Sequence, residues 1–128
     1  MSYIHKVRYY ECDGMAVCHH SNYVRFMEEA RIDLLDRLGY GYERMEADGI
    51  TSPVISFSCN CIRPTRFQDE IDIEIRVLKT TALKLTFSYT MSVGGHLVCT
   101  AESTHCFLQD GKPVPFADKY ECLRQIDA

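Results

Sequence analysis

Residues 10–23 of this 128-residue chain read YECDGMAVCHHSNY, and they join an apolar segment to an amphipathic one. Asp13 lies a few residues before the expected start of a helix, and His19, His20 and Tyr23 crowd that junction. A helix N-terminus presents free backbone N–H groups and the positive end of the helix dipole. A carbonyl oxygen placed there is polarised, and a nearby carboxylate can attack the carbonyl carbon or activate a water. An ester or thioester carbonyl placed at this junction would meet both groups.

The helix after this stretch is predicted by apolar residues at three- and four-residue spacing, from about Asn22 to Leu38. These apolar residues are Tyr23, Phe26, Met27, Ala30, Leu34, Leu35 and Leu38. Charged residues, Arg31 among them, fill most of the other positions. Ser21 is the expected N-cap, and Gly39 is expected to stop the helix.

Strands are expected on both sides of the helix. Before it, residues from about Tyr3 to Cys12 are expected to form a strand with Val7 and Tyr9 on one face. After it, a short polar stretch with helical character ends at Gly49, and the apolar period then changes to two. That alternation is typical of half-buried antiparallel strands. The strands are expected over residues 53–62, 71–77, 83–93 and 97–108, with a hairpin turn at Gly94-Gly95 and a short terminal helix over Ala117–Gln125.

This order of elements predicts the fold class. A long helix followed by antiparallel strands favours an α+β domain in which the helix covers one face of the sheet. A chain of 128 residues is expected to form one domain over residues 1–128. The sheet would leave unpaired edges, and such edges are usually covered or paired.

Composition excludes several kinds of partner. A formal net charge of −4 argues against a nucleic-acid partner, which normally needs a basic patch. No apolar run is long enough for a membrane span, and Met1–Lys6 lacks the features of a signal peptide. We therefore expect a cytoplasmic protein.

Seven cysteines are scattered along the chain. In a cytosolic protein they are expected to be reduced and mostly buried. A metal site built from Cys12, Cys18, His19 and His20 lacks the compact ligand pairs of zinc sites, and Cys59 and Cys61 share one face of a strand. No metal is therefore expected.

The chain resembles the hotdog-fold acyl-CoA thioesterases of the 4-hydroxybenzoyl-CoA thioesterase-like group. The resemblance begins with residues 10–23 and continues through Arg63-Pro64, Asp69-Glu70-Ile71 and Asp110-Gly111-Lys112-Pro113, so it spans nearly the whole chain. It implies a hotdog fold, with one long central helix wrapped by an antiparallel sheet. It also implies self-association to a dimer or tetramer with the active site at the subunit interface. One departure is Ala16, where the family often has glycine; alanine is disfavoured there if the backbone needs a positive φ, and Gly14 is an alternative source of flexibility.

The resemblance also implies roles for individual residues. Asp13 would be the catalytic carboxylate, and the backbone N–H of His20 would face the thioester oxygen. His19 would orient Asp13, relay a proton or lie at the interface; either histidine could act as a general base. A turn-forming role for Asp13 and a packing role for each histidine are the alternatives. The expected substrate-binding residues are Tyr23, Asn22, Met27, Phe57 and Arg63, with Phe67 as a further candidate for the acyl pocket.

The predicted function is hydrolysis of a short-chain aliphatic or aromatic acyl-CoA to the free acid and coenzyme A, without a metal or organic cofactor. An acyl carrier protein is an alternative donor of the acyl group. Three other functions remain open from the sequence. They are a hydratase or dehydratase on acyl thioesters, a non-catalytic acyl-CoA or acyl-carrier-protein binding module, and a metal-binding regulatory protein.

Overall fold

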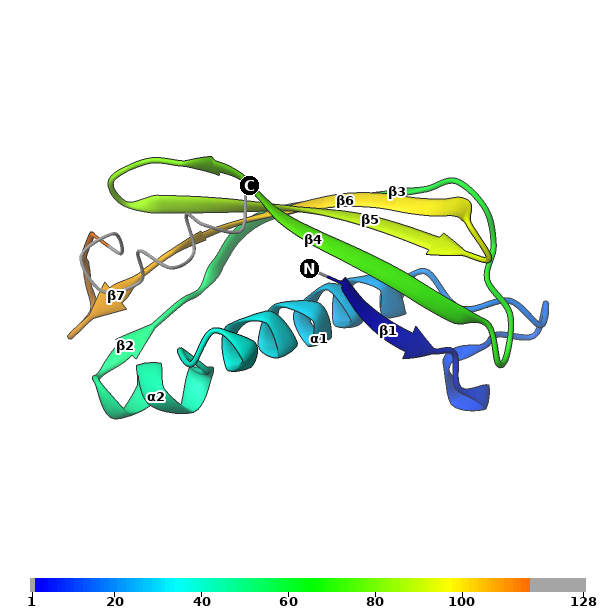
Figure 1. Ribbon diagram of the computed structural model, residues 1–128, viewed down its shortest axis with the longest axis horizontal. Coiled ribbons are helices and arrows are strands. Elements are labelled where there is room, and N and C mark those ends of the chain that lie inside the picture. The colour runs from blue at the N-terminus through cyan, green and yellow to red at the C-terminus, as the bar shows by residue number, and fades with distance from the viewer. Residues whose placement is uncertain (1, 116–128) are drawn as a thin grey trace.

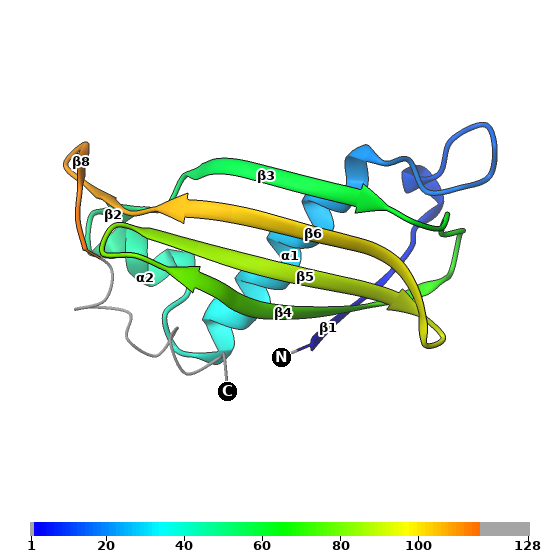
Figure 2. The same cartoon turned by 90° about the horizontal axis from the view of Figure 1, so that it is seen from above.

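Five antiparallel strands form the main sheet, in the order β1-β4-β5-β6-β3 (Figures 1 and 2). Their bounds are β1 (Ser2–Lys6), β3 (Val54–Cys61), β4 (Glu70–Thr80), β5 (Lys84–Val93) and β6 (His96–Cys106). A smaller sheet contains β2 (Ile50–Thr51), β7 (Leu108–Gln109) and β8 (Lys112–Pro113). The structure, a computed structural model, describes residues 2–115, so the helix expected over Ala117–Gln125 lies outside the described residues.

Helix α1 (Ser21–Arg37) lies across one face of the main sheet, as Figure 1 shows. The predicted apolar face is confirmed, because its members are buried except for Leu38, which is half-buried. The helix stops where expected, with Gly39 at a φ of 80°. The helical character before Gly49 is also confirmed, as the short helix α2 (Tyr42–Ala47). None of the helices in residues 2–115 has the length and apolar character needed to cross a membrane.

The core forms between α1 and the inward faces of β4 and β5. Their antiparallel register places Ile73 opposite Met91 and Ile75 opposite Tyr89, and these side chains are almost fully buried. Alternation in sequence thus becomes one buried and one solvated face. The hairpin turn at Gly94 and Gly95 is confirmed, because both residues have the positive φ that such a turn requires. The predicted α+β architecture, with a helix on an antiparallel sheet, is confirmed.

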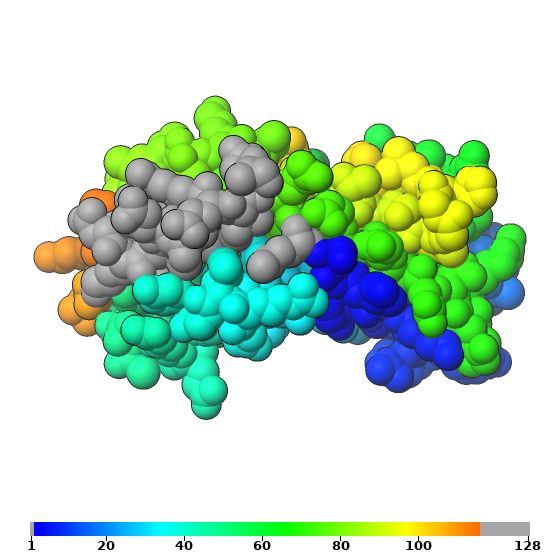
Figure 3. Space-filling model, in the orientation of Figure 1, coloured from blue at the N-terminus to red at the C-terminus, as the bar shows by residue number. Residues whose placement is uncertain are grey.

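The N-terminal strand is shorter than predicted. Strand β1 ends at Lys6, and the 3₁₀ turn η1 (Tyr9–Glu11) replaces the second half of the expected strand. The Glu11 carboxylate causes this turn, because it accepts the backbone N–H of Arg8 at 2.7 Å. Tyr9 is consequently 79% exposed, whereas Val7 is buried. Strand β1 itself lies directly beside α1 on the surface (Figure 3), where Tyr3 Oη donates to Glu29 Oε1 at 3.0 Å.

Among residues 2–115, strand β3 is an edge of the main sheet and pairs only with β6. Its apolar residues remain exposed; they include Ile55 and Phe57, at 46% and 58%. A register shift between Val54 and Ser56 bends the strand near its start. Helix α1 and strand β3 therefore leave apolar side chains uncovered along their common boundary.

Candidate active site before helix α1

The loop before α1 is a small hairpin that presents Asp13. Cys12 and Cys18 form an antiparallel bridge, and the N–H of Asp13 donates to Val17 O at 2.9 Å. The Asp13 carboxylate accepts the N–H of Met15 at 2.8 Å, which is an Asx turn. Asp13 is half-buried, so one side of its carboxylate stays accessible. Asp13 therefore does form a turn, which was the alternative to a catalytic role. The turn uses one carboxylate oxygen and leaves the other available for chemistry.

Ala16 adopts the conformation that the sequence made questionable. Its φ is 63°, in the left-handed region, whereas Gly14 does not have a positive φ. The loop therefore places the unusual backbone at the alanine rather than using the flexibility of Gly14. The N–H of Ala16 donates to Asp13 O at 3.0 Å, so this backbone conformation belongs to the turn that holds Asp13.

Asn22 fastens the start of α1 to this loop. Its buried amide donates to Glu11 O at 3.0 Å and to His19 O at 3.3 Å. The N–H of His19 also donates to Glu11 O at 2.8 Å. In this hairpin Glu11 lies opposite His19, and Asp13 lies opposite Val17. Asp13 is therefore displaced along the hairpin by two residues, roughly 7 Å, from the position of His19. Asn22 therefore fixes the helix start relative to the loop.

His19 and His20 lie at the helix start with different surroundings. His20 is the N-cap position, one residue earlier than the expected Ser21. His19 Nδ1 lies 2.8 Å from Ser21 Oγ and accepts the N–H of Ser21 at 3.2 Å, so the His19 ring satisfies a backbone donor of the first turn. The two exposed imidazole rings stack with centroids 4.2 Å apart. Within residues 2–115, the backbone N–H of His20 has no hydrogen-bond acceptor.

A buried acidic contact beneath the loop was not predicted from the sequence. Glu11 is almost fully buried, and its Oε1 lies 2.8 Å from Nε2 of the buried His5. His5 Nδ1 lies 3.3 Å from Glu29 Oε1 on α1. This contact was missed because Glu11 was expected to lie in the same extended strand as His5. The contact joins β1, η1 and α1, and it therefore helps to hold the loop in place.

Tyr23 belongs to the core. It is 2% exposed, and its hydroxyl lies 2.8 Å from Oγ1 of the fully buried Thr65. Burial raises the pKa of Tyr23 to about 12, so the phenol stays protonated at neutral pH. The N–H of Cys18 donates to Thr65 O at 2.7 Å. Tyr23 and Thr65 thus connect the loop, α1 and the segment after β3.

A cavity of about 470 Å³ opens between α1 and β3. It brings together two of the predicted pocket residues, Met27 and Phe57. Tyr23 and Phe67 do not line it; Phe67 lies instead in another hollow, with its ring 5.6 Å from that of Tyr9. The remaining lining residues are Val24, Glu28, Arg31, Val54, Ile55, Ser56 and Ser103. The cavity has the size and largely apolar lining of a small-molecule site.

A buried polar chain borders this cavity. Arg31 Nη1 donates to Tyr89 Oη at 3.0 Å, Tyr89 Oη lies 2.6 Å from Ser103 Oγ, and Ser103 Oγ lies 2.7 Å from His105 Nε2. Burial, and then the positive charge of Arg31, lower the pKa of His105 to about 4. His105 is therefore a hydrogen-bonded core histidine. Arg31 is buried although the sequence placed it outside the apolar face, because helical periodicity does not show that β3 flanks this side of α1.

Arg63 is exposed just after β3, and its backbone N–H donates to Val98 O at 3.1 Å. Its side chain stands clear of the cavity lining. A guanidinium in this position is accessible to a phosphate of a bound ligand.

Three thiols lie close together on β3 and β6. Cys59 Sγ is 3.4 Å from Cys99 Sγ and 4.0 Å from Cys61 Sγ. Among residues 2–115 this is the one group of three or more potential metal ligands within 4.8 Å of one another. The other cysteines considered as ligands, Cys12 and Cys18, each direct the thiol toward a backbone carbonyl.

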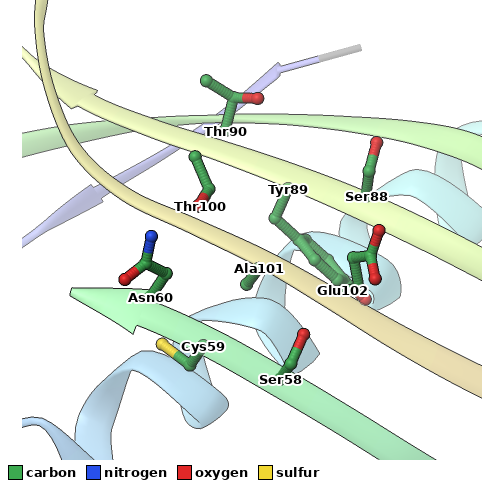
Figure 4. A pocket seen from close by; sticks show the side chains of 9 residues that line it. All are labelled: Ser58, Cys59, Asn60, Ser88, Tyr89, Thr90, Thr100, Ala101 and Glu102. Atoms are coloured by element: carbon green, nitrogen blue, oxygen red, sulfur yellow. The ribbon is translucent and has the colours of Figure 1, made fainter. Parts of the chain in front are cut away.

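A polar hollow of about 310 Å³ lies on the face of the sheet turned away from α1, as Figure 4 shows. Hydroxyl side chains from β3, β5 and β6 line it together with Asn60 and Glu102. The sheet separates this hollow from the helix start, so its carboxylate does not contribute to the Asp13 loop.

Comparison with known proteins identifies the family and agrees with the fold. The family model of the thioesterase-like superfamily matches residues 7–121. A relative from Aquifex aeolicus named "Putative esterase" is 30% identical over 112 residues, covering 88% of each chain. "Putative acyl-CoA thioesterase YneP" from Bacillus subtilis is 29% identical, covering 87% of this chain and 83% of the relative. The crystal structure of the DHNA-CoA thioesterase from Staphylococcus aureus has a TM-score of 0.88 at 26% identity, covering 98% of this chain and 86% of that one.

The chain belongs to the thioesterase-like superfamily and has the hotdog fold. The predicted class of enzyme, an acyl-CoA thioester hydrolase, is confirmed at the level of this family. The roles of individual residues remain predictions.

Proposed function

We propose that the protein hydrolyses a short-chain aliphatic or aromatic acyl-CoA to the free acid and coenzyme A, using Asp13. The observation that carries this proposal is the pairing of two features in one loop. Asp13 is held in a turn with one carboxylate oxygen engaged, and the N–H of His20 at the helix start has no acceptor within residues 2–115. The Asp13 carboxylate supplies the negative charge for attack, and the N–H of His20 supplies a hydrogen-bond donor for the carbonyl oxygen that becomes negative.

In the proposed reaction, the N–H of His20 donates to the thioester carbonyl oxygen, and the dipole of α1 adds to the polarisation. The Asp13 carboxylate either attacks the carbonyl carbon or removes a proton from an attacking water. The carbon–sulfur bond then breaks, and coenzyme A leaves as a thiolate that takes up a proton. His19 acts as a positioning residue, because its ring holds the N–H of Ser21.

The cavity between α1 and β3 is proposed to take the acyl group, because Met27 and Phe57 give it an apolar wall. Asn22 is proposed to act by holding the helix start, since its amide is bonded to the loop, and Tyr23 by packing beneath it. Arg63 is proposed to meet a phosphate of coenzyme A. The reaction as proposed needs no metal or organic cofactor, and an acyl carrier protein is the alternative donor. The cytoplasmic location also remains a prediction.

The test is thiol release from a panel of acyl-CoAs running from acetyl through medium aliphatic chains to benzoyl. Asp13→Asn should lower kcat/KM by at least about 100-fold, because it removes the attacking or proton-accepting charge. Asp69→Asn is the matched control, since the Asp69 carboxylate also accepts a backbone N–H, that of Arg66 at 2.8 Å. The control should stay within about threefold of the unmodified protein.

The outcomes separate the proposal from its alternatives. Equal losses in both variants would show that Asp13 only supports the loop. Formation or hydration of a double bond without thiol release would favour a hydratase or dehydratase. Binding of acyl-CoA without any turnover would favour a binding module, with Ala16 as the first position to examine.

A further inference from the structure

Arg31 is a buried cation that lacks a counter-ion. It is 5% exposed, and it forms no ion pair with a carboxylate within residues 2–115. Its Nη1 donates to Tyr89 Oη, but its Nε is buried without a hydrogen-bond partner. Burial of an unpaired charge is costly unless something compensates it. An orphaned donor of this kind therefore points to a ligand group that is absent when the site is empty.

No carboxylate among residues 2–115 supplies that compensation, although the phenols of Tyr89 and Tyr42 favour the charged guanidinium and raise the pKa of Arg31 against the effect of burial. On the sheet side it meets Tyr89 and then Ser103 and His105, which are uncharged groups at neutral pH. On the α2 side it shares a hollow with Tyr42, and on its own helix Glu28 is exposed at the rim. Glu28 lines the same cavity but makes no contact with Arg31 within ion-pair distance.

Arg31 also occupies a defined place in the cavity. Val24, Met27 and Arg31 follow one side of α1 at spacings of three and four residues, and Ser103 faces them from β6. At about 1.5 Å per residue, Arg31 lies roughly 16 Å along the axis from His20. Long side chains on a helix tend to point back toward its N-terminus, an orientation that would bring the guanidinium closer to the helix start. An acyl group anchored at the helix start can therefore reach past Val24 and Met27 to the guanidinium.

We propose that Arg31 determines substrate specificity by binding a carboxylate at the far end of the acyl group, so that the preferred substrates are thioesters of medium-length dicarboxylic acids. This inference rests on the proposed thioesterase function and deepens it. The guanidinium is well suited to the task, because it offers several donors in a fixed plane that matches a carboxylate. The apolar middle of the cavity fits the methylene chain between the two ends.

The experiment compares matched substrates that differ only at the far end: suberoyl-CoA against octanoyl-CoA, and adipoyl-CoA against hexanoyl-CoA. The unmodified protein should prefer the carboxylated member by at least about tenfold in kcat/KM. In Arg31→Met, the ratio of the carboxylated to the uncharged substrate should fall at least about tenfold. Arg37→Met is the control, because Arg37 is on the same helix but pairs with Asp33 at 3.0 Å outside the cavity. It should keep the ratio of the unmodified protein.

Thermal unfolding distinguishes recognition from a structural role. Arg31→Met should leave Tm unchanged or raise it in the absence of substrate, since it removes an unpaired buried charge and Tyr89 keeps its contact with Ser103. A clear fall in Tm for both Arg31→Met and Glu28→Gln would instead make Glu28 the counter-ion and overturn the proposal. A preference for the uncharged substrates, or equal losses on both members of a pair, would overturn it as well.

A binding measurement separates failure of this inference from failure of the proposed function. If no acyl-CoA releases thiol, the thioesterase proposal fails, and suberate and octanoate are then compared by calorimetry. Suberate should bind the unmodified protein at least about tenfold more tightly than it binds Arg31→Met. Equal affinities for suberate would overturn the role of Arg31, whichever result the activity assay gives.

Discussion

Ala16 holds the Asp13 loop in a backbone conformation that L-residues rarely adopt, with a φ of 63°. The left-handed region costs roughly 1–2 kcal/mol for a residue with a Cβ, and glycine avoids most of that cost while losing about 0.5–1 kcal/mol through greater chain entropy. Ala16→Gly is therefore expected to raise the free energy of unfolding by up to about 1 kcal/mol. Urea unfolding monitored by circular dichroism measures the change.

Ala16→Val is expected to change the free energy of unfolding in the opposite direction. A β-branched residue is more strongly disfavoured at positive φ, so this variant should lose about 1 kcal/mol or more. If glycine destabilised the protein and valine did not, the left-handed conformation would not be the source of the strain.

At the scale of elements, the polar chain from Arg31 on α1 through Tyr89 on β5 to Ser103 and His105 on β6 makes stability depend on pH. The pKa of His105 falls from 6.5 to about 4 on folding. Between these values the unfolded chain binds a proton that the folded chain does not, so stability is full above about pH 6.5 and decreases as the pH falls toward 4. Between pH 7.5 and pH 5 the loss from this group is about 2 kcal/mol.

Denaturant unfolding at pH 7.5 and pH 5 tests this dependence. His105→Gln keeps a polar partner for Ser103 but does not titrate, so its stability should change less between the two pH values. The difference from the unmodified protein should be about 2 kcal/mol. Equal pH dependence in both proteins would mean that other groups control the acid sensitivity.

At the scale of the whole molecule, the exposed edge of β3 is the feature that most needs a partner. Its outer backbone has no pairing strand in the described part of the chain, and this edge together with the exposed Ile55 and Phe57 favours pairing with a second copy of the chain. We expect sedimentation to give at least a dimer. Ile55→Lys should shift the protein toward the monomer, because charge on an edge strand opposes pairing.

Leu78→Lys is the matched control, since Leu78 is an apolar residue of similar exposure, 53%, on the internal strand β4. It should leave the oligomeric state unchanged. A monomeric unmodified protein, or equal dissociation by both variants, would exclude β3 as the interface.

Much of the fold was predictable because its signals are local. The apolar face of α1, the alternation in β4 and β5, and the glycines at 39, 94 and 95 each depend on neighbours only a few residues away. The strand that was expected to continue to Cys12 ends at Lys6, for a local reason that composition does not reveal. The Glu11 side chain bonds the backbone of Arg8 and folds the chain into a turn.

The candidate site likewise combines residues that the sequence predicted with contacts that it did not predict. The motif over residues 10–23 identified Asp13, His20 and Asn22 as neighbours of the helix start, because they are close in the chain. The contacts of Glu11 with His5 and of Tyr23 with Thr65 join distant segments and left no pattern in the sequence. Those contacts give the loop its support.

The helix, the inward faces of the central strands and the carboxylate before the helix follow from the sequence alone, since periodicity and short-range turn chemistry are enough for these. Long-range packing was needed to show that Arg31 is buried beside a cavity, that Phe67 lies away from it, and that Cys99 lies close to Cys59 and Cys61. The physical reason is that helical spacing states which residues share a face, whereas burial depends on which strand packs beside that face. Strand β3 takes that place through its pairing with β6, about forty residues further along the chain.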